Sequence, residues 1–313
     1  MSVLSEEERA DYIWMDGKQV KWDDAKVHIK AHVLSYGTGV FEGIRGYAYN
    51  DNVNIFRLRK HLDRLYYSAM IYRMNIPFTK EELKNAIVKL IIDNEMRVDC
   101  YIRPLVYRGY GPFGVNPLRS PINVAIYVIP IGEYLGKGAT KRGIKCLVSS
   151  WQRIPSHAIP IHAKACGNYL NSVIARLEAI ERNYDEAIFL DHRGFISEGT
   201  GENLFAVKDG RASTPPSYAS ILMGITRDSL ITLLKEELHI EVVETDITRA
   251  SLYDMDEVFI CGTAGEITPV VVIDHTEVGD GKPGPLTKRL QRVYLDTVRG
   301  KISRYSNWIM PVY

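Results

Sequence analysis

The chain has 313 residues, a length that favours two domains over one continuous core. Hydrophobic residues make up 46% of it and charged residues 25%, as in an average soluble globular protein. The 39 basic and 38 acidic residues nearly cancel to a net charge of +1, which gives no support to a nucleic-acid or membrane-surface partner.

The four cysteines lie far apart, without C-x-x-C spacing or a suitable histidine, so we expect neither a disulfide framework nor a metal site. Residues 1–11 are polar and acidic, whereas a secretory signal would be basic and then apolar. The longest apolar run, 122–131, is interrupted and too short to span a membrane. These features predict a cytoplasmic protein.

Strand and helix signals alternate through the first 130 residues. Residues 12–22 predict a β-hairpin, because the Asp-Gly pair within them tolerates the positive φ of a tight turn. Thr79 and Glu82 form a capping-box pattern, so we expect a helix to begin there and to run to about Asn94. Two further segments have strand character, residues 101–107 and 122–131.

The second half contains three stretches in which apolar residues recur at helical spacing, Leu170 to Ile180, Leu230 to Leu238 and Leu286 to Tyr294. Short strands are expected between them, at Ile144 to Ser149 and Glu186 to Leu190. We predict three parts: a small N-terminal α/β domain (1–130), a glycine-rich interdomain loop (131–141) and a large C-terminal α/β domain (142–313). The absence of an early G-x-G-x-x-G motif argues against a Rossmann domain.

Glycine, charge and hydroxyl groups recur together in several segments: 36–45, 101–104, 164–169, 197–203, 224–226 and 262–265. Glycine lets backbone amides approach a ligand closely. The hydroxyl of Thr226 stands at the start of a predicted helix, where an anion is favoured. The pattern therefore predicts a phosphate-binding site.

Lys164 stands among small residues in the segment 163–167, which leaves room for a planar ring. Only a free amine attacks an aldehyde, and burial near other cations is what lowers the pKa of a lysine. A pyridoxal ring also needs an acid beside its ring nitrogen, and Glu198 is a candidate. Most lysines, however, lie on a solvated face, so Lys164 alone does not decide the function.

Five motifs together resemble the branched-chain aminotransferases of pyridoxal-5'-phosphate (PLP) fold type IV. They are Ser35 to Arg45, Tyr101 to Pro104, Ser197 to Phe205, Gly224 to Asp228 and Gly262 to Pro269. The resemblance extends from Asp11 to about Val298 and implies two mixed α/β domains joined by an interdomain loop. It further implies a PLP-dependent, ping-pong transfer of the amino group of leucine, isoleucine or valine to 2-oxoglutarate, giving a branched 2-oxo acid and L-glutamate.

The resemblance also implies how the cofactor is held. Lys164 would be the catalytic lysine that forms the Schiff base, Tyr169 would hydrogen-bond the phenolic oxygen, and Glu198 would pair with the pyridine nitrogen. Four residues would hold the phosphate: Arg59, Ile225, Thr226 and Thr263.

On the substrate side, the resemblance implies an apolar side-chain pocket with three aromatic walls, Phe41, Tyr101 and Tyr134. The loop around Ala264 would offer amides to the α-carboxylate, and Arg103 would receive the distal carboxylate of glutamate. Tyr36 would reach in from a partner subunit, so we expect a homo-oligomer, at least a dimer. Three departures from the family pattern border the implied site, Cys166, Met223 and Gly265.

Simpler interpretations accompany these roles. Arg59 and Arg64 could form the solvated face of a helix that begins near Arg57. Glu202 and Glu266 are interpreted as groups that cap amides in glycine-rich turns, not as catalytic acids.

Two alternative functions stay open. Another fold type IV enzyme, such as a D-amino acid or amine aminotransferase or an aminodeoxychorismate lyase, would share Lys164 and Glu198. Tyr101, Arg103 and the Gly-Thr-Ala sequence at 262–264 favour the L-branched-chain type. The other alternative is a phosphate- or nucleotide-binding module that performs no covalent chemistry.

Overall fold

The computed structural model describes residues 9–313, so residues 1–8 of the acidic N-terminal segment lie outside the described part. The described residues divide into two compact units: unit 1 contains 9–132, 163–167 and 297–313, and unit 2 contains 133–162 and 168–296. The sequence-based limits instead assign 163–167 and 297–313 to the second domain. These segments belong to unit 1 because Ala165 bridges to Val40, and because the last strand pairs with an early one.

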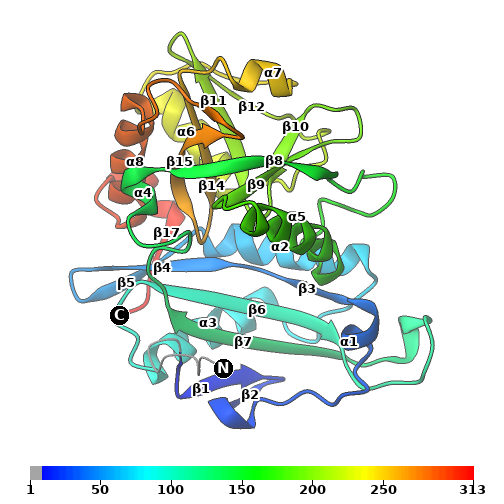
Figure 1. Cartoon of the computed structure of the whole chain (residues 1–313). Helices are drawn as coiled ribbons and strands as arrows, with labels where there is room; N and C mark the ends of the chain where they lie inside the picture. The colour runs from blue at the N-terminus through cyan, green and yellow to red at the C-terminus, as the bar shows by residue number, and fades with distance from the viewer. Residues whose placement is uncertain (1–8) are drawn as a thin grey trace. The chain divides into compact units, whose positions relative to one another are not determined.

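Unit 1 is built on an eight-stranded sheet with the order β17-β5-β4-β6-β7-β1-β2, in which β3 also pairs with β6 (Figure 1). Its strands are β1 (Tyr12–Met15), β2 (Lys18–Lys21), β3 (Gly39–Phe41), β4 (Ile44–Tyr49), β5 (Asn52–Phe56), β6 (Cys100–Arg108), β7 (Ile122–Pro130) and β17 (Ile309–Pro311). The predicted hairpin is confirmed, with φ of 46° at Asp16 and 95° at Gly17 in its turn. Both long predicted strands are also confirmed, as β6 and β7.

Helices α1 (His32–Tyr36), α2 (Leu58–Ile71) and α3 (Lys80–Asp93) accompany this sheet, with short 3-10 helices η2 (Trp22–Asp24), η3 (Pro117–Arg119) and η5 (Ser303–Trp308). The predicted capping box at the start of α3 is present, since Thr79 accepts the amide of Glu82 and Glu82 accepts the amide of Thr79. Leu65 of α2 and Ile87 of α3 are fully buried in the core of the unit. Apolar faces of both helices thus complete the core that the sheet begins.

Unit 2 is built on a nine-stranded mixed sheet with the order β10-β9-β8-β15-β14-β11-β12-β13, to which β16 is added beside β15. Its strands are β8 (Ile144–Gln152), β9 (Glu186–Leu190), β10 (Ile196–Gly199), β11 (Asn203–Lys208), β12 (Arg211–Thr214), β13 (Val242–Glu244), β14 (Glu257–Gly262), β15 (Glu266–Ile273) and β16 (Thr276–Glu277). The central strand β8 runs parallel to both of its neighbours, β9 and β15. Strand β14 runs antiparallel to its own two neighbours, β11 and β15. The expected strands after residues 144 and 186 are confirmed as β8 and β9.

The remaining helices are η4 (Cys166–Asn168), α4 (Ala139–Arg142), α5 (Tyr169–Glu181), α6 (Ile225–Glu236), α7 (Arg249–Leu252) and α8 (Pro285–Val298). The three helices predicted from apolar spacing are confirmed as α5, α6 and α8. In α6 the apolar residues Leu230 and Leu233 are buried, but in α5 the apolar stripe faces outwards and small or polar residues such as Ala175 and Asn171 are buried instead. Within residues 9–313, the helices lack the combination of length and apolar sequence that crossing a membrane requires.

Candidate functional site

The peptide of Lys164 in unit 1 is fixed on both sides. Its carbonyl accepts the amide of Phe41 at 3.0 Å, and the bridge between Val40 and Ala165 continues this pairing. Its own amide donates to the hydroxyl oxygen of Ser68, on α2, at 3.0 Å. The segment 163–167 is therefore held between β3 and α2, which sets the direction in which the lysine side chain leaves the backbone.

The Lys164 side chain is half-buried, and its amine lies 5.1 Å from the centre of the Phe41 ring. Burial, together with the nearby guanidinium of Arg64, lowers the pKa of this amine to about 8, while Glu42 acts in the opposite direction. The sequence-based expectation of a lysine whose pKa falls through burial near other cations agrees with these surroundings.

A buried ionic cluster next to this lysine did not emerge from the sequence. Glu42 accepts from Arg64 through Nε at 2.6 Å and through a terminal nitrogen at 2.8 Å, and its other contact is His61 Nδ1 at 2.7 Å. Burial alone would raise the pKa of Glu42, but Arg64 and His61 outweigh it and hold this pKa at about 2. Burial also lowers the pKa of His61. The interpretation of Arg64 as a solvated residue is wrong, whereas Arg59 does lie exposed.

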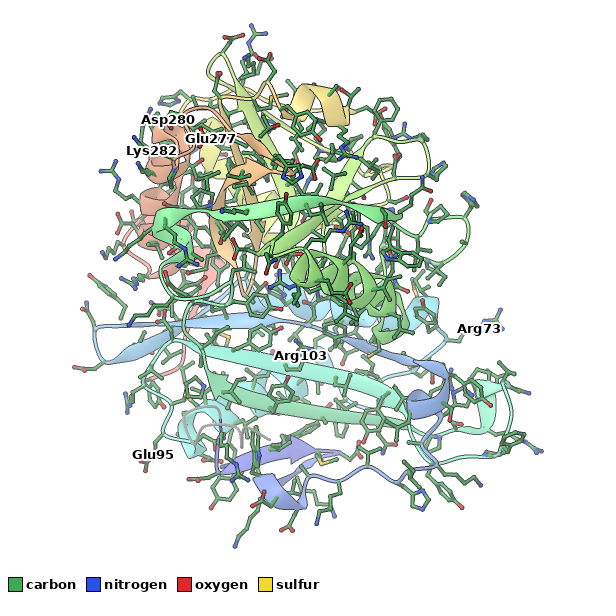
Figure 2. The ribbon with its side chains drawn as sticks, viewed as in Figure 1. Arg73, Glu95, Arg103, Glu277, Asp280 and Lys282 are labelled. Atoms are coloured by element: carbon green, nitrogen blue, oxygen red, sulfur yellow. The ribbon has the colours of Figure 1, made fainter. Side chains whose placement is uncertain are left out.

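Arg103 lies on β6 of the same unit (Figure 2), and its guanidinium is close to two aromatic rings. Its guanidinium carbon is 4.4 Å from the ring centre of Phe41 and 5.1 Å from that of Tyr101, and a terminal nitrogen donates to the Tyr101 hydroxyl at 2.7 Å. Such stacking suits a planar cation and fixes its orientation. Unit 1 thus brings Lys164, Phe41, Tyr101 and Arg103 together.

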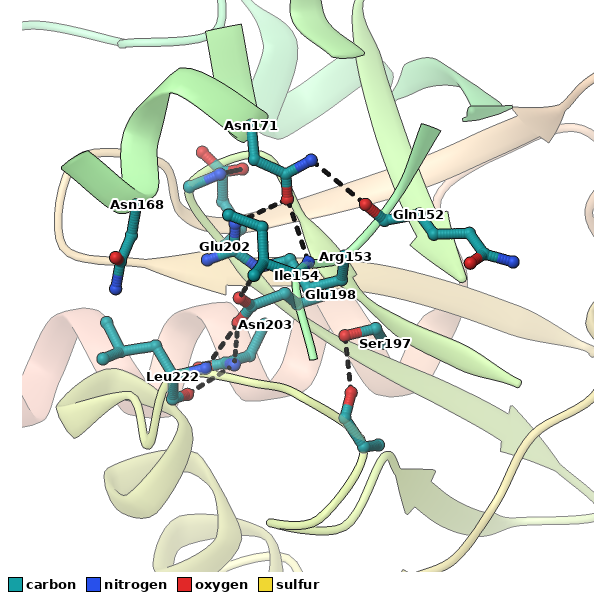
Figure 3. Close-up of polar contacts among 12 residues, drawn as sticks. Gln152, Arg153, Ile154, Asn168, Asn171, Ser197, Glu198, Glu202, Asn203 and Leu222 are labelled. Carbon is teal, nitrogen blue, oxygen red and sulfur yellow. Dashed lines mark hydrogen bonds and ion pairs between the residues drawn. The ribbon is translucent and has the colours of Figure 1, made fainter. Parts of the chain in front are cut away.

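Glu198 lies on β10 in unit 2 and is buried (Figure 3). One carboxylate oxygen accepts from Arg153 Nε at 2.9 Å, and the other accepts from the Leu222 amide at 2.9 Å and from Asn203 Nδ2 at 3.2 Å. Asn171 in turn contacts Arg153 at 3.2 Å. The carboxylate is therefore held by donors from three separate segments, and Arg153 is a contributor that the sequence motifs did not reveal.

Three glycine-containing segments of unit 2 converge beside Glu198. A Cβ on Gly224 would lie 2.0 Å from Asn203 Oδ1, and one on Gly262 would lie 3.3 Å from the Gly201 carbonyl, so only glycine permits these approaches without displacement. Gly224 is the N-cap of α6 and provides no side-chain cap, while Thr226 in the first turn is buried. The predicted helix start is thus present in unit 2, and helix N-termini are positions where an anion is favoured.

Glu202 lies in this region and accepts the amide of Gly201 at 3.0 Å, as its interpretation as an amide cap requires. Burial, with a further contribution from the negative charge of Glu186, raises the pKa of Glu202 to about 8. The group therefore carries a proton at neutral pH, so it adds no negative charge beside the glycine-rich turns.

The other predicted positions are distributed over both units. In unit 2, Thr263 and Ala264 are half-buried in the turn between β14 and β15, Ile225 is buried, Tyr169 begins α5, and Tyr134 is exposed. In unit 1, Tyr36 ends α1 and is 40% exposed, and Arg59 is exposed in the first turn of α2. The cofactor and substrate roles of all these residues, and those of Lys164, Glu198 and Arg103, stay predictions.

Comparison with known proteins gives consistent matches over nearly the whole chain. The amino-transferase class IV family matches residues 39–273. A branched-chain-amino-acid aminotransferase of Salmonella typhimurium is 48% identical over 97% of this chain and 98% of its own length. The crystal structure of the Escherichia coli branched-chain amino acid aminotransferase superposes with a TM-score of 0.95 at 47% identity, covering 97% of this chain and all of that one.

A second solved structure is informative about ligands. The T.th. branched-chain amino acid aminotransferase, complexed with N-(5'-phosphopyridoxyl)-L-glutamate, superposes with a TM-score of 0.92 at 43% identity, covering 98% of this chain and all of that one. The ligand of that relative joins a phosphopyridoxyl group to glutamate.

Proposed function

Because the chain belongs to the class IV aminotransferase family, we infer that it is a branched-chain amino acid transaminase of PLP fold type IV. It transfers the amino group of a branched-chain L-amino acid to a 2-oxo acid. The compared relatives are branched-chain aminotransferases, and the match extends over nearly their full length. A D-amino acid aminotransferase, an amine aminotransferase or a lyase is therefore not favoured. A binding module without covalent chemistry is not favoured either.

We propose PLP as the cofactor, and three features of the chain fit its three functional groups. Lys164 supplies an amine with a lowered pKa for the aldehyde. Glu198 offers only acceptors, which is what the N–H of a protonated pyridine needs. The uncapped N-terminus of α6, with Ile225 and Thr226, suits a phosphate. The further roles proposed for Arg59, Tyr169 and Thr263 follow from the family resemblance.

The single observation that carries this proposal is the environment of Lys164. With a pKa of about 8, about one tenth of the amine is free base at pH 7, compared with about three parts in ten thousand at the ordinary value of 10.5. When bound, the pyridine ring of PLP supplies an electron sink for the substrate carbanion. Lys164 would then move a proton from Cα of the amino acid to C4' of the cofactor, acting first as general base and then as general acid.

We propose 2-oxoglutarate as the amino acceptor and L-glutamate as its product, in a ping-pong sequence. A pocket that accepts leucine must then also accept a carboxylate, and burying a carboxylate without a partner is costly. Arg103 provides that partner, while Phe41 and Tyr101 keep its guanidinium in place and offer apolar walls to leucine. Tyr134 and the amides around Ala264 complete the proposed substrate contacts.

We also propose that the chain works in the cytoplasm as a homo-oligomer, at least a dimer, in which Tyr36 completes the site of the partner subunit. The outward apolar stripe of α5 supports self-association, since Leu170 is 71% and Leu177 52% exposed. Contiguous exposed apolar side chains commonly mark an interface.

A half-reaction assay tests the proposed function. The purified protein, loaded with PLP, is mixed separately with leucine, isoleucine, valine, glutamate, phenylalanine, D-alanine and a primary amine, and the loss of PLP absorbance is followed. We expect fast conversion with the three branched-chain L-amino acids and with glutamate. Faster conversion with D-alanine or the amine would assign the chain to another class IV activity, and no conversion with any compound would refute transamination.

A further inference from the structure

Helix α2 presents three polar residues at spacings of three and four, His61, Arg64 and Ser68, on the face directed towards Lys164 and Glu42. Two of them, His61 and Ser68, are almost completely buried. Residues at this spacing lie on one side of a helix. A buried polar stripe is costly unless each group has a partner, so the partners of this stripe show what it does.

The partners of the stripe lead to Lys164 by two routes. Ser68 accepts the Lys164 amide directly at 3.0 Å. Arg64 and His61 hold Glu42, whose own amide donates to the Pro104 carbonyl at 2.9 Å. Glu42 directly follows Phe41, the residue whose amide donates to the Lys164 carbonyl. The backbone amide of Lys164 is therefore hydrogen-bonded to α2 itself, through Ser68. The backbone carbonyl is hydrogen-bonded to Phe41, which is next to the Glu42 that α2 holds in an ion pair.

We propose that Ser68 and the ion pair between Arg64 and Glu42 are positioning residues for Lys164, an inference that rests on the proposed role of this lysine. Ser68 fixes the peptide from which the side chain leaves. The ion pair fixes the strand on the other side of that peptide and places two opposite charges close to the amine. These residues act through Lys164, on the direction and protonation of its amine.

The charges facing the amine give this arrangement a testable sign. Arg64 and Arg103 favour the free amine, whereas Glu42 and Tyr101 favour the ammonium form. Replacing Arg64 should therefore raise the pKa of Lys164, and replacing Glu42 should lower it. Arg103 and Tyr101 are present in both variants, so they contribute equally to both. Loss of packing alone predicts no such opposition.

The first experiment measures the equilibrium affinity of Ser68→Ala for PLP, which can bond to Lys164, and for pyridoxamine 5'-phosphate, which cannot. The matched control is Ser149→Ala, because Ser149 is a buried serine of unit 2 that also accepts a backbone amide, that of Trp151 at 3.0 Å. We expect Ser68→Ala to weaken PLP about tenfold and pyridoxamine phosphate less than about twofold. The control variant Ser149→Ala should bind PLP and pyridoxamine phosphate with the same affinities as the wild type.

An equal loss for both cofactors in Ser68→Ala would mean that Ser68 supports the fold only, and would overturn its positioning role. If Ser68→Ala does not fold, Ser68→Cys tests the same point, because sulfur fills a similar space but is a weak acceptor. The same selective loss of PLP affinity is expected there, and unchanged affinity would equally overturn the role.

The second experiment titrates Lys164 in the cofactor-free full chain, by trace acetylation with acetic anhydride between about pH 6 and 10 and mass spectrometry of the Lys164 peptide. We expect Arg64→Gln to raise the midpoint and Glu42→Gln to lower it, each by about one pH unit, and the double variant to lie near the wild type. Shifts in the same direction, or none, would overturn the electrostatic part. His61 also faces Glu42, but the expected midpoints lie at about pH 7 and above, where the lowered pKa of His61 leaves this imidazole mostly neutral in the wild type.

Failure of this inference and failure of the proposed function are distinguishable. Borohydride reduction of the wild-type protein with PLP, followed by peptide mapping, shows whether Lys164 carries the pyridoxyl group. A label on another lysine refutes the proposed function and with it this inference. A label on Lys164, together with unchanged affinities and midpoints in the variants, refutes only the positioning role.

Discussion

Replacing Arg103 by alanine should lower kcat/KM for glutamate much more than for leucine, because glutamate and 2-oxoglutarate carry a distal carboxylate and leucine does not. The guanidinium is half-buried, stacked 4.4 Å from Phe41 and bonded at 2.7 Å to the Tyr101 hydroxyl. Losing one partner of a buried charge pair costs about 2–5 kcal/mol, and losing one partner of an exposed pair costs under about 1 kcal/mol. For this half-buried and pre-oriented group we expect about 2–3 kcal/mol, or a loss of about 30- to 150-fold in kcat/KM for glutamate.

In Arg103→Ala, kcat/KM for leucine should fall much less than kcat/KM for glutamate. The side chain of Arg103 also covers the Phe41 ring, and the loss of such a contact costs about 0.5–1 kcal/mol, which corresponds to about fivefold or less. Arg103→Met keeps an apolar stem over that ring without the charge, so it should reproduce the glutamate defect and leave leucine closer to the wild type. Tyr101→Phe removes only the hydroxyl that orients Arg103 and should cost about two- to tenfold with glutamate.

The assay follows each half-reaction separately in a stopped-flow spectrometer, by the conversion of bound PLP to pyridoxamine phosphate with leucine and then with glutamate. This separation prevents a defect in one half-reaction from masking the other in a steady-state rate. Equal losses with the two amino acids in both Arg103→Ala and Arg103→Met would refute the dual-recognition role and assign Arg103 to the fold or to the α-carboxylate site.

Three further outcomes are expected. Lys164→Ala should still bind PLP through its phosphate but lose the borohydride-sensitive bond to the chain, which absorbance and peptide mapping check. Tyr36→Ala should leave the dimer intact in sedimentation yet reduce kcat/KM, and a fully active wild-type monomer would contradict the proposed assembly. The native Glu202 carboxyl keeps its proton to about pH 8, while the unfolded one loses it near 4.5, so the stability of the wild type should fall as pH rises between these values. Glu202→Gln should remove this slope, which corresponds to about 2–4 kcal/mol in free energy of unfolding between pH 4.5 and pH 8, as denaturant titrations across pH would show.

The family and its local structural elements could be predicted from the sequence because their signals act over short distances. The Asp16-Gly17 turn, the Thr79 capping box and the start of α6 at Gly224 each depend on residues within one or two turns of backbone. The motif around Lys164 likewise pointed to the lysine that we propose as the reactive amine, because small neighbours and a lysine are adjacent in sequence.

Tertiary structure decided which polar residues are buried as pairs. Glu42, Arg64 and Lys164 are far apart in the sequence, so the sequence does not show that they are close in space. In sequence, Arg64 has the features of a residue on a solvated helix face. Ser68 has no distinguishing sequence pattern. Arg153 supports Glu198 in the same way, from 45 positions away. Hydrogen bonds and ion pairs of this kind produce no periodic pattern in the sequence, because each depends on how separate strands and helices pack against one another.

The sequence also determined the amphipathic character of α5, but not which of its faces is covered. Apolar spacing correctly predicted a helix, yet Ala175 and Asn171 face the unit while Leu170 and Leu177 point outwards. Helical periodicity depends only on the residues of the helix itself, whereas burial depends on what packs against each face. Local sequence therefore specified the elements and the candidate reactive groups, and the tertiary structure determined their partners, their burial and the resulting pKa values.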